Sequence, residues 1–91
     1  MILSDEFRAG LVNDILLANS QDEVKKLINA AIKAFEHSNA ESYATYQFVD
    51  KISDELALFT PMNKGAQQWS NIQFAKILFR RIQRRMHEQL P

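Results

Sequence analysis

The chain has 91 residues, of which 46% are hydrophobic and 24% charged, and these ordinary globular values argue against a disordered chain. It contains no cysteine, which excludes disulfides and thiolate metal sites and favours a cytoplasmic protein. The net charge is zero, but residues 1–63 carry five basic and ten acidic side chains, whereas residues 64–91 carry six basic and one acidic. The chain is therefore divided into a part of charge −5 and a part of charge +5.

Helices are favoured throughout the chain. Only two glycines and two prolines occur, and no segment alternates apolar and polar residues as a strand does. We predict one all-α domain over residues 1–91, a small four-helix bundle-like domain with mainly antiparallel packing and a basic C-terminal helix. Its helices are expected at about 5–18, 21–37, 39–59 and 70–88, with a loop at 60–69.

No segment predicts membrane insertion or export. The longest apolar run, residues 15–18, is far too short to cross a bilayer. Asp5 and Glu6 stand where a signal peptide would need a basic and then an apolar run. We therefore expect no membrane partner.

Ser4 is expected to cap the first helix, and it is followed by two acidic residues that suit the positive end of the helix dipole. Gly10 lies inside this helix and costs roughly 1 kcal/mol relative to alanine. We expect a close helix–helix approach at this glycine to compensate. The apolar residues recur three and four apart and form the stripe Phe7, Leu11, Val12, Ile15 and Leu16.

Two capping boxes predict the starts of the next helices. Ser20 with Glu23 opens the second helix, and Ser38 with Glu41 opens the third. Pro61 ends the third helix, because proline cannot continue it. The predicted core stripes are Val24, Leu27, Ile28, Ala31, Ile32 and Phe35 in the second helix, and Phe48, Val49, Ile52, Leu56 and Phe59 in the third.

The last helix is predicted to begin at Ser70, which forms a capping box with Gln73. Trp69 and Phe74 occupy the two positions of a hydrophobic staple around that start. At 100° per residue, one arc of the helix is apolar and is expected to face the core. This arc comprises Ile72, Ala75, Leu78, Phe79, Ile82 and Met86.

The rest of the last helix supplies the candidate interaction site. Lys76, Arg80 and Arg84 form a basic row opposite the core arc. The apolar residues Phe74 and Ile77 lie on a flank of the helix, with arginines on either side. Aromatic and arginine side chains are enriched at protein interfaces. The candidate interaction residues are Phe74, Ile77, Lys76, Arg80, Arg81, Arg84 and Arg85, together with Tyr43 and Tyr46 on the third helix. The two tyrosines either pack under the first helix or the 60–69 loop, or form an interface patch.

Three interpretations of the basic helix stay open. Its cations could suit the C-terminal end of the helix dipole and be balanced by acidic residues such as Asp50 and Asp54. They could instead contact a protein partner or a second copy of the chain. In the third interpretation, the helix at 70–88 is the recognition helix of a DNA-binding, helix-turn-helix-like domain. Its contacting residues would be Asn71, Gln73, Lys76, Arg80 and Arg84.

No pattern of catalytic residues is visible. The chain has two histidines, His37 and His87, both predicted near helix ends. Neither glycine belongs to a phosphate-binding motif, and no Glu-x-x-His pair could build a di-metal centre. We therefore predict a protein without enzymatic activity, metal, cofactor or small-molecule substrate. Its expected role is a small intracellular protein-interaction or self-association module, with DNA binding as the alternative.

Overall fold

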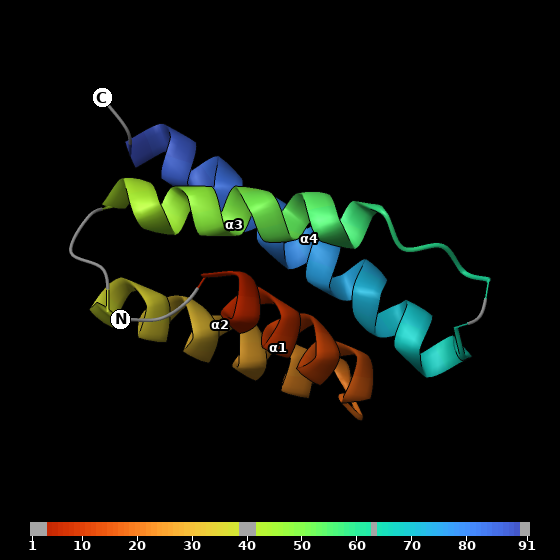
Figure 1. The fold of residues 1–91 in the computed structure, drawn as a ribbon. Coiled ribbons are helices and arrows are strands. Elements are labelled where there is room, and N and C mark those ends of the chain that lie inside the picture. The colour runs from red at the N-terminus through yellow and green to blue at the C-terminus, as the bar shows by residue number, and fades with distance from the viewer. Residues whose placement is uncertain (1–3, 39–41, 63, 90–91) are drawn as a thin grey trace.

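The computed structural model describes residues 4–38, 42–62 and 64–89. Four helices make up most of this part of the chain: α1 (Ser4–Leu17), α2 (Gln21–Ser38), α3 (Ser42–Ala57) and α4 (Ala66–Gln89). No strand occurs within these ranges. In the view of Figure 1, α1 and α2 lie below α3, and α4 runs behind them from the lower right to the upper left. The predicted all-α, four-helix class is confirmed.

Consecutive helices run antiparallel, as contacts between their ends show. Phe7 near the start of α1 meets Phe35 near the end of α2, with ring centroids 6.2 Å apart. Phe35 in turn stacks on Phe48 in the first half of α3, at 4.5 Å and 14°. Tyr46 near the start of α3 contacts His87 at the end of α4. The connectivity is therefore up-down-up-down, and the short connections between the first three helices agree with their antiparallel packing.

One hydrophobic core joins all four helices. Every apolar residue assigned above to a core stripe is buried in it or packs against it. The side chains with no exposed surface include Ile15, Val24, Ile28, Val49, Ile52, Leu56, Ile72, Ala75 and Phe79. Each helix thus contributes a stripe, because the three- and four-residue spacing places these side chains on one side of each helix.

Helix boundaries agree with the sequence at one predicted capping box and differ at the end of α3. The backbone N–H of Glu23 donates to the Ser20 hydroxyl at 3.1 Å, and the Glu23 carboxylate accepts the N–H of Asn19 at 2.7 Å. The second predicted box pairs Ser38, which is the last residue of α2, with Glu41, which lies outside the described residues. Helix α3 stops at Ala57, two residues before the predicted end. Just beyond it, the backbone N–H groups of Leu58 and Phe59 donate to the carbonyls three residues earlier, as in a 3₁₀ turn.

Helix α4 begins at Ala66, four residues before the predicted start at Ser70. Gly65 acts as the N-cap, since its carbonyl accepts the N–H of Trp69 at 3.0 Å and its own N–H donates to Gln68 Oε1 at 3.4 Å. The predicted Ser70 box and the staple outside the helix are therefore wrong. Trp69 lies in the first turn of α4 and packs against the core.

The expected close approach at Gly10 is also wrong. A Cβ added at this glycine would have no neighbouring atom within 4 Å. No described helix is long and apolar enough to cross a bilayer.

Candidate interaction surface on the last helix

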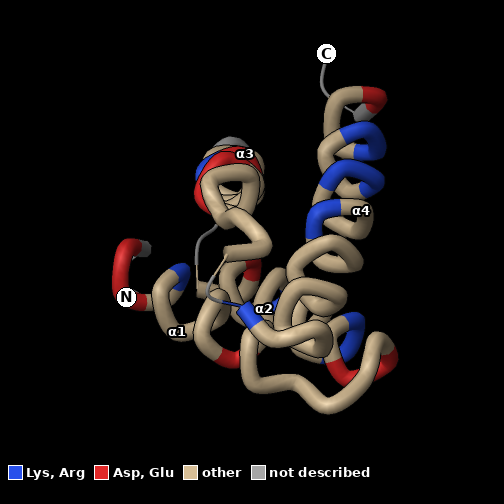
Figure 2. The backbone as a smooth tube through the Cα atoms, turned by 90° about the vertical axis from the view of Figure 1, so that its right-hand side faces the viewer, with Lys and Arg blue, Asp and Glu red and all other residues tan. Residues whose placement is uncertain are grey.

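Helix α4 separates an apolar side from a charged side. Ile72, Ala75 and Phe79 are fully buried, whereas the arginines of the second half are exposed. We call the set Ile77, Arg80, Arg81, Arg84 and Arg85 the basic face of α4. Figure 2 shows Lys and Arg gathered in the second half of α4, while acidic residues lie on α3 and at the start of α1.

The acidic residues of α3 do not pair with this face. The Asp50 carboxylate accepts a hydrogen bond from Gln83 Nε2 at 3.0 Å, and Gln83 Oε1 accepts one from the Ser53 hydroxyl at 3.5 Å. In the described part of the chain, no arginine of the basic face forms an ion pair, and neither does Asp54. The expected balance by Asp50 and Asp54 therefore does not occur through direct contact, and the positive charge faces solvent.

The two apolar candidates on α4 differ in exposure. Phe74 is half-buried and packs against the core. Ile77 keeps 47% of its surface exposed. Arg80 and Arg81 follow Ile77 by three and four residues, which makes them its neighbours on the helix surface. Of the two apolar candidates, only Ile77 is therefore exposed enough to contact a partner.

The tyrosine candidates lie on α3. Tyr46 is half-buried and its hydroxyl lies 2.7 Å from His87 Nε2, with the two rings edge to face at 5.3 Å. Tyr46 thus packs on α4 rather than under the first helix or the 60–69 loop. Tyr43 also belongs to α3, but its side chain lies outside the described part of the structure. The contact with His87 holds the basic end of α4 against the start of α3.

Asn71 belongs to the core and not to a nucleic-acid site. Its side chain is fully buried, and Nδ2 donates to the carbonyls of Ile15 at 2.9 Å and Ala18 at 2.8 Å. Its Oδ1 accepts a hydrogen bond from Gln67 Nε2 at 2.9 Å. The predicted base-reading role is therefore wrong, because the amide is enclosed and its hydrogen bonds are made within the chain.

The other members of the predicted nucleic-acid set stay on the surface. Gln73 and Lys76 are half-buried, and Arg80 and Arg84 are exposed. Lys76, Arg80 and Arg84 are four residues apart, so they follow one another by about one turn along α4. This row carries positive charge that could contact phosphates. Asn71, which was predicted to read bases beside it, is buried in the core.

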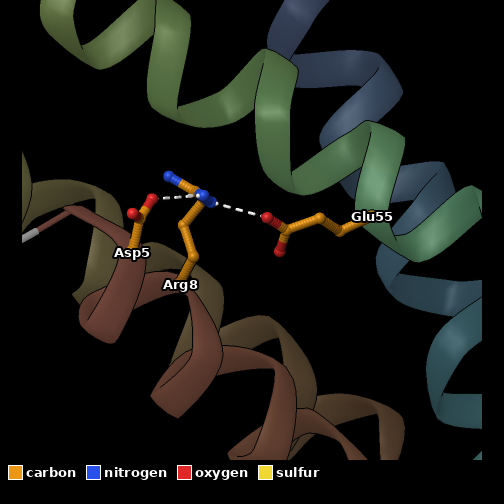
Figure 3. A network of polar contacts seen from close by, with 3 residues as sticks. All are labelled: Asp5, Arg8 and Glu55. Carbon is orange, nitrogen blue, oxygen red and sulfur yellow. Dashed lines mark hydrogen bonds and ion pairs between the residues drawn. The ribbon is translucent and has the colours of Figure 1, made fainter.

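A buried arginine network was not predicted from the sequence. Arg8 of α1 is 9% exposed and is held between Asp5 Oδ1 at 2.7 Å and Glu55 Oε1 at 2.8 Å (Figure 3). Burial acts to lower the pKa of Arg8, but hydrogen bonds and the charges of Glu55 and Asp5 outweigh it and raise that pKa. Arg8 therefore stays charged and links α1 to α3. Its partner on α3 lies 47 residues away, beyond the reach of helical periodicity.

The described residues contain no group of three or more His, Asp or Glu that could hold a metal ion. No protein family, curated protein or solved structure matches the chain.

Proposed function

We propose that the chain is a small cytoplasmic protein-interaction module that binds a protein partner through the basic face of α4. The observation that carries this proposal is the half-exposed Ile77 among four exposed arginines that form no ion pair within the described residues. A guanidinium can bind a carboxylate through two parallel hydrogen bonds, and arginine is enriched where proteins meet. The matching partner surface would be acidic around an apolar pocket.

The packing of α4 against the rest of the bundle holds the basic face in place, so a partner could bind it with little rearrangement of the helix. The opposite side of α4 is anchored in the core by Ile72, Ala75 and Phe79. Near its end, the helix is further tied to α3 by Gln83 and His87. A surface held rigidly in one conformation loses less entropy on binding than a mobile one. The arginine side chains are then the main groups to be ordered by a partner.

We propose no enzymatic activity, cofactor or small-molecule substrate for this module. The candidate surface consists of cations around an aliphatic side chain, which suits recognition and offers no nucleophile next to a base. His87 is occupied with the Tyr46 hydroxyl. His37, at the end of α2, is exposed.

Nucleic acid is the second candidate partner. The row of Lys76, Arg80 and Arg84 favours it, because cations one turn apart can follow phosphates. With Asn71 buried, such binding would rely on the phosphate backbone more than on base contacts. We rank it second because the exposed apolar side chain of Ile77 beside the arginines has no role in binding phosphates.

Site-specific photo-crosslinking tests the proposed function. A benzophenone amino acid would replace Ile77 in one variant and the exposed Lys25 of α2 in a control variant, both illuminated in cells. We expect a protein adduct of defined mass at position 77 but not at position 25. Changing Arg81 and Arg84 to glutamine should reduce that adduct. A nuclease-sensitive adduct would favour the nucleic-acid candidate, and no adduct, or the same adducts at both positions, would contradict the proposal.

A further inference from the structure

A second surface lies between the first two helices. Helices α1 and α2 border a shallow apolar groove of about 370 Å³, which we call the α1–α2 groove. Phe7, Leu11 and Leu27 contribute its large apolar side chains. Its remaining lining includes small residues, Gly10 on α1 and Ala30 and Ala34 on α2. The groove is therefore open to solvent and lined mainly by apolar side chains, so it can accept a protruding aliphatic side chain.

The rim of this groove is acidic. Glu6 and Asp14 lie among its lining residues, both exposed, and neither forms an ion pair with any described residue. They lie four residues before and after Gly10, so their backbones are separated by about 12 Å along α1. Leu17, seven residues beyond Gly10 and on the same side of the helix, is 65% exposed. The groove thus combines unpaired negative charge with accessible apolar surface.

Gly10 has no explanation within one copy of the chain. Glycine inside a helix is destabilising relative to alanine, and it is useful where another backbone or ligand approaches closely. Within this fold nothing comes within 4 Å of a Cβ added at Gly10. The small lining at Gly10, Ala30 and Ala34 is therefore free to admit a group from outside.

We propose that the α1–α2 groove of one copy receives the basic face of α4 of a second copy. The inference rests on the proposed function, since it names the partner of the same face. Ile77 would enter the groove over Gly10, and the arginines that follow Ile77 would meet the acidic rim. The two surfaces are complementary in charge, because they belong to the −5 and +5 parts of the chain.

The proposed contact forms between copies. Figure 2 shows the start of α1 and the basic half of α4 on opposite sides of the molecule, so the start of α1 does not meet the basic half of α4 of the same chain. Each copy would use one surface to bind and the other to be bound, a head-to-tail arrangement that closes into a ring or continues as a chain of copies.

Sedimentation velocity over a range of protein concentrations tests this inference. The weight-average mass of the wild type should rise above the 10.5 kDa of one copy as concentration increases. It should fall back toward one copy at high salt, because the screening length shortens from about 8 Å at physiological ionic strength to about 3 Å at 1 M. A mass of one copy at every concentration in low salt would overturn the inference.

Filling the groove separates docking from folding. Gly10→Leu should raise the dissociation constant about tenfold or more, the effect of losing one central contact. It should leave the helical circular dichroism and the thermal midpoint at least as high as in the wild type, since space is available at Gly10. Ala9→Leu, on the exposed surface of α1 outside the groove lining, is the matched control and should associate normally. Equal association of the two variants would overturn the assignment of the groove.

Mixing two charge-reversed variants tests the pairing of the surfaces. Glu6→Arg/Asp14→Arg removes the acidic rim, and Arg81→Glu/Arg84→Glu removes the basic charge. Each variant alone should stay monomeric, whereas an equimolar mixture should form a complex, because each still carries the surface that the other lacks. A mixture that stays monomeric would overturn the pairing. If the wild type is monomeric but position 77 crosslinks to another protein, self-docking is wrong and the proposed function stands.

Discussion

The amide of Asn71 joins two helix ends that are distant in the sequence. Its Nδ2 donates to carbonyls at the end of α1 that lie 56 and 53 residues away, and its Oδ1 accepts from Gln67. The last carbonyls of a helix have no partner within that helix, so a side chain from α4 completes the end of α1. The contact also fixes where the start of α4 sits against the core.

Asn71→Ala should lower the free energy of unfolding by about 2 kcal/mol, because it takes the side-chain donor from the Ala18 carbonyl and leaves the Ile15 carbonyl with only the backbone N–H of Ala18. Urea unfolding followed by circular dichroism measures this loss. Gln67→Ala is the control, since it removes only the one hydrogen bond that the exposed Gln67 side chain donates to Asn71 Oδ1, and it should cost about 1 kcal/mol, less than Asn71→Ala. Equal costs for the two variants would contradict the capping role of Asn71.

Residue-scale features were the least accessible to sequence reasoning. Asn71 precedes the core residue Ile72 and lies one turn before Ala75, and this spacing was the available signal that it borders the core. Arg8 gave no such signal, because its partner Glu55 is on a different helix. Periodicity identifies the side of a helix that is buried, but it does not identify which polar group meets which across the bundle.

At the scale of the element, α1 contains a glycine that lowers its stability and could be replaced. Gly10 sits in the middle of this helix, and a Cβ there would meet nothing within 4 Å. Gly10→Ala should therefore raise the free energy of unfolding by about 1 kcal/mol, the difference in helix propensity. Urea unfolding at low protein concentration measures the monomer without a contribution from association.

The same substitution at Gly65 is the matched control. Gly65 precedes α4 as its N-cap, where alanine is worse than glycine, so Gly65→Ala should not stabilise the protein. A stabilisation of similar size at both positions, or none at Gly10, would contradict this account of α1.

The apolar stripes of all four helices could be predicted because a three- and four-residue spacing directly reports the buried side. The start of α4 could not, since two capping patterns compete within nine residues. Gly65 with Gln68 and Ser70 with Gln73 both satisfy the spacing of a capping box, and glycine is the weaker cap on propensity alone. The burial of Trp69 against the core favours the earlier start, and that packing is a tertiary effect.

At the scale of the whole molecule, the division of charge could be predicted from the sequence, but its use could not. Some negative charge of the acidic part holds Arg8 in place through Asp5 and Glu55. The basic face of α4 has no such partner among the described residues, because Gln83 takes the place of an arginine beside Asp50. Positive charge left in solvent beside an exposed Ile77 is what the proposed interaction uses.

The most direct test of this central claim is the free energy of unfolding of a variant with Arg80, Arg81, Arg84 and Arg85 all changed to glutamine. It should be measured by urea denaturation in low salt and at low protein concentration. We expect a change of less than about 1 kcal/mol, because exposed charges contribute little to folding and these four repel one another. A loss of about 3 kcal/mol or more would contradict the account and show that the arginines are neutralised within their own chain.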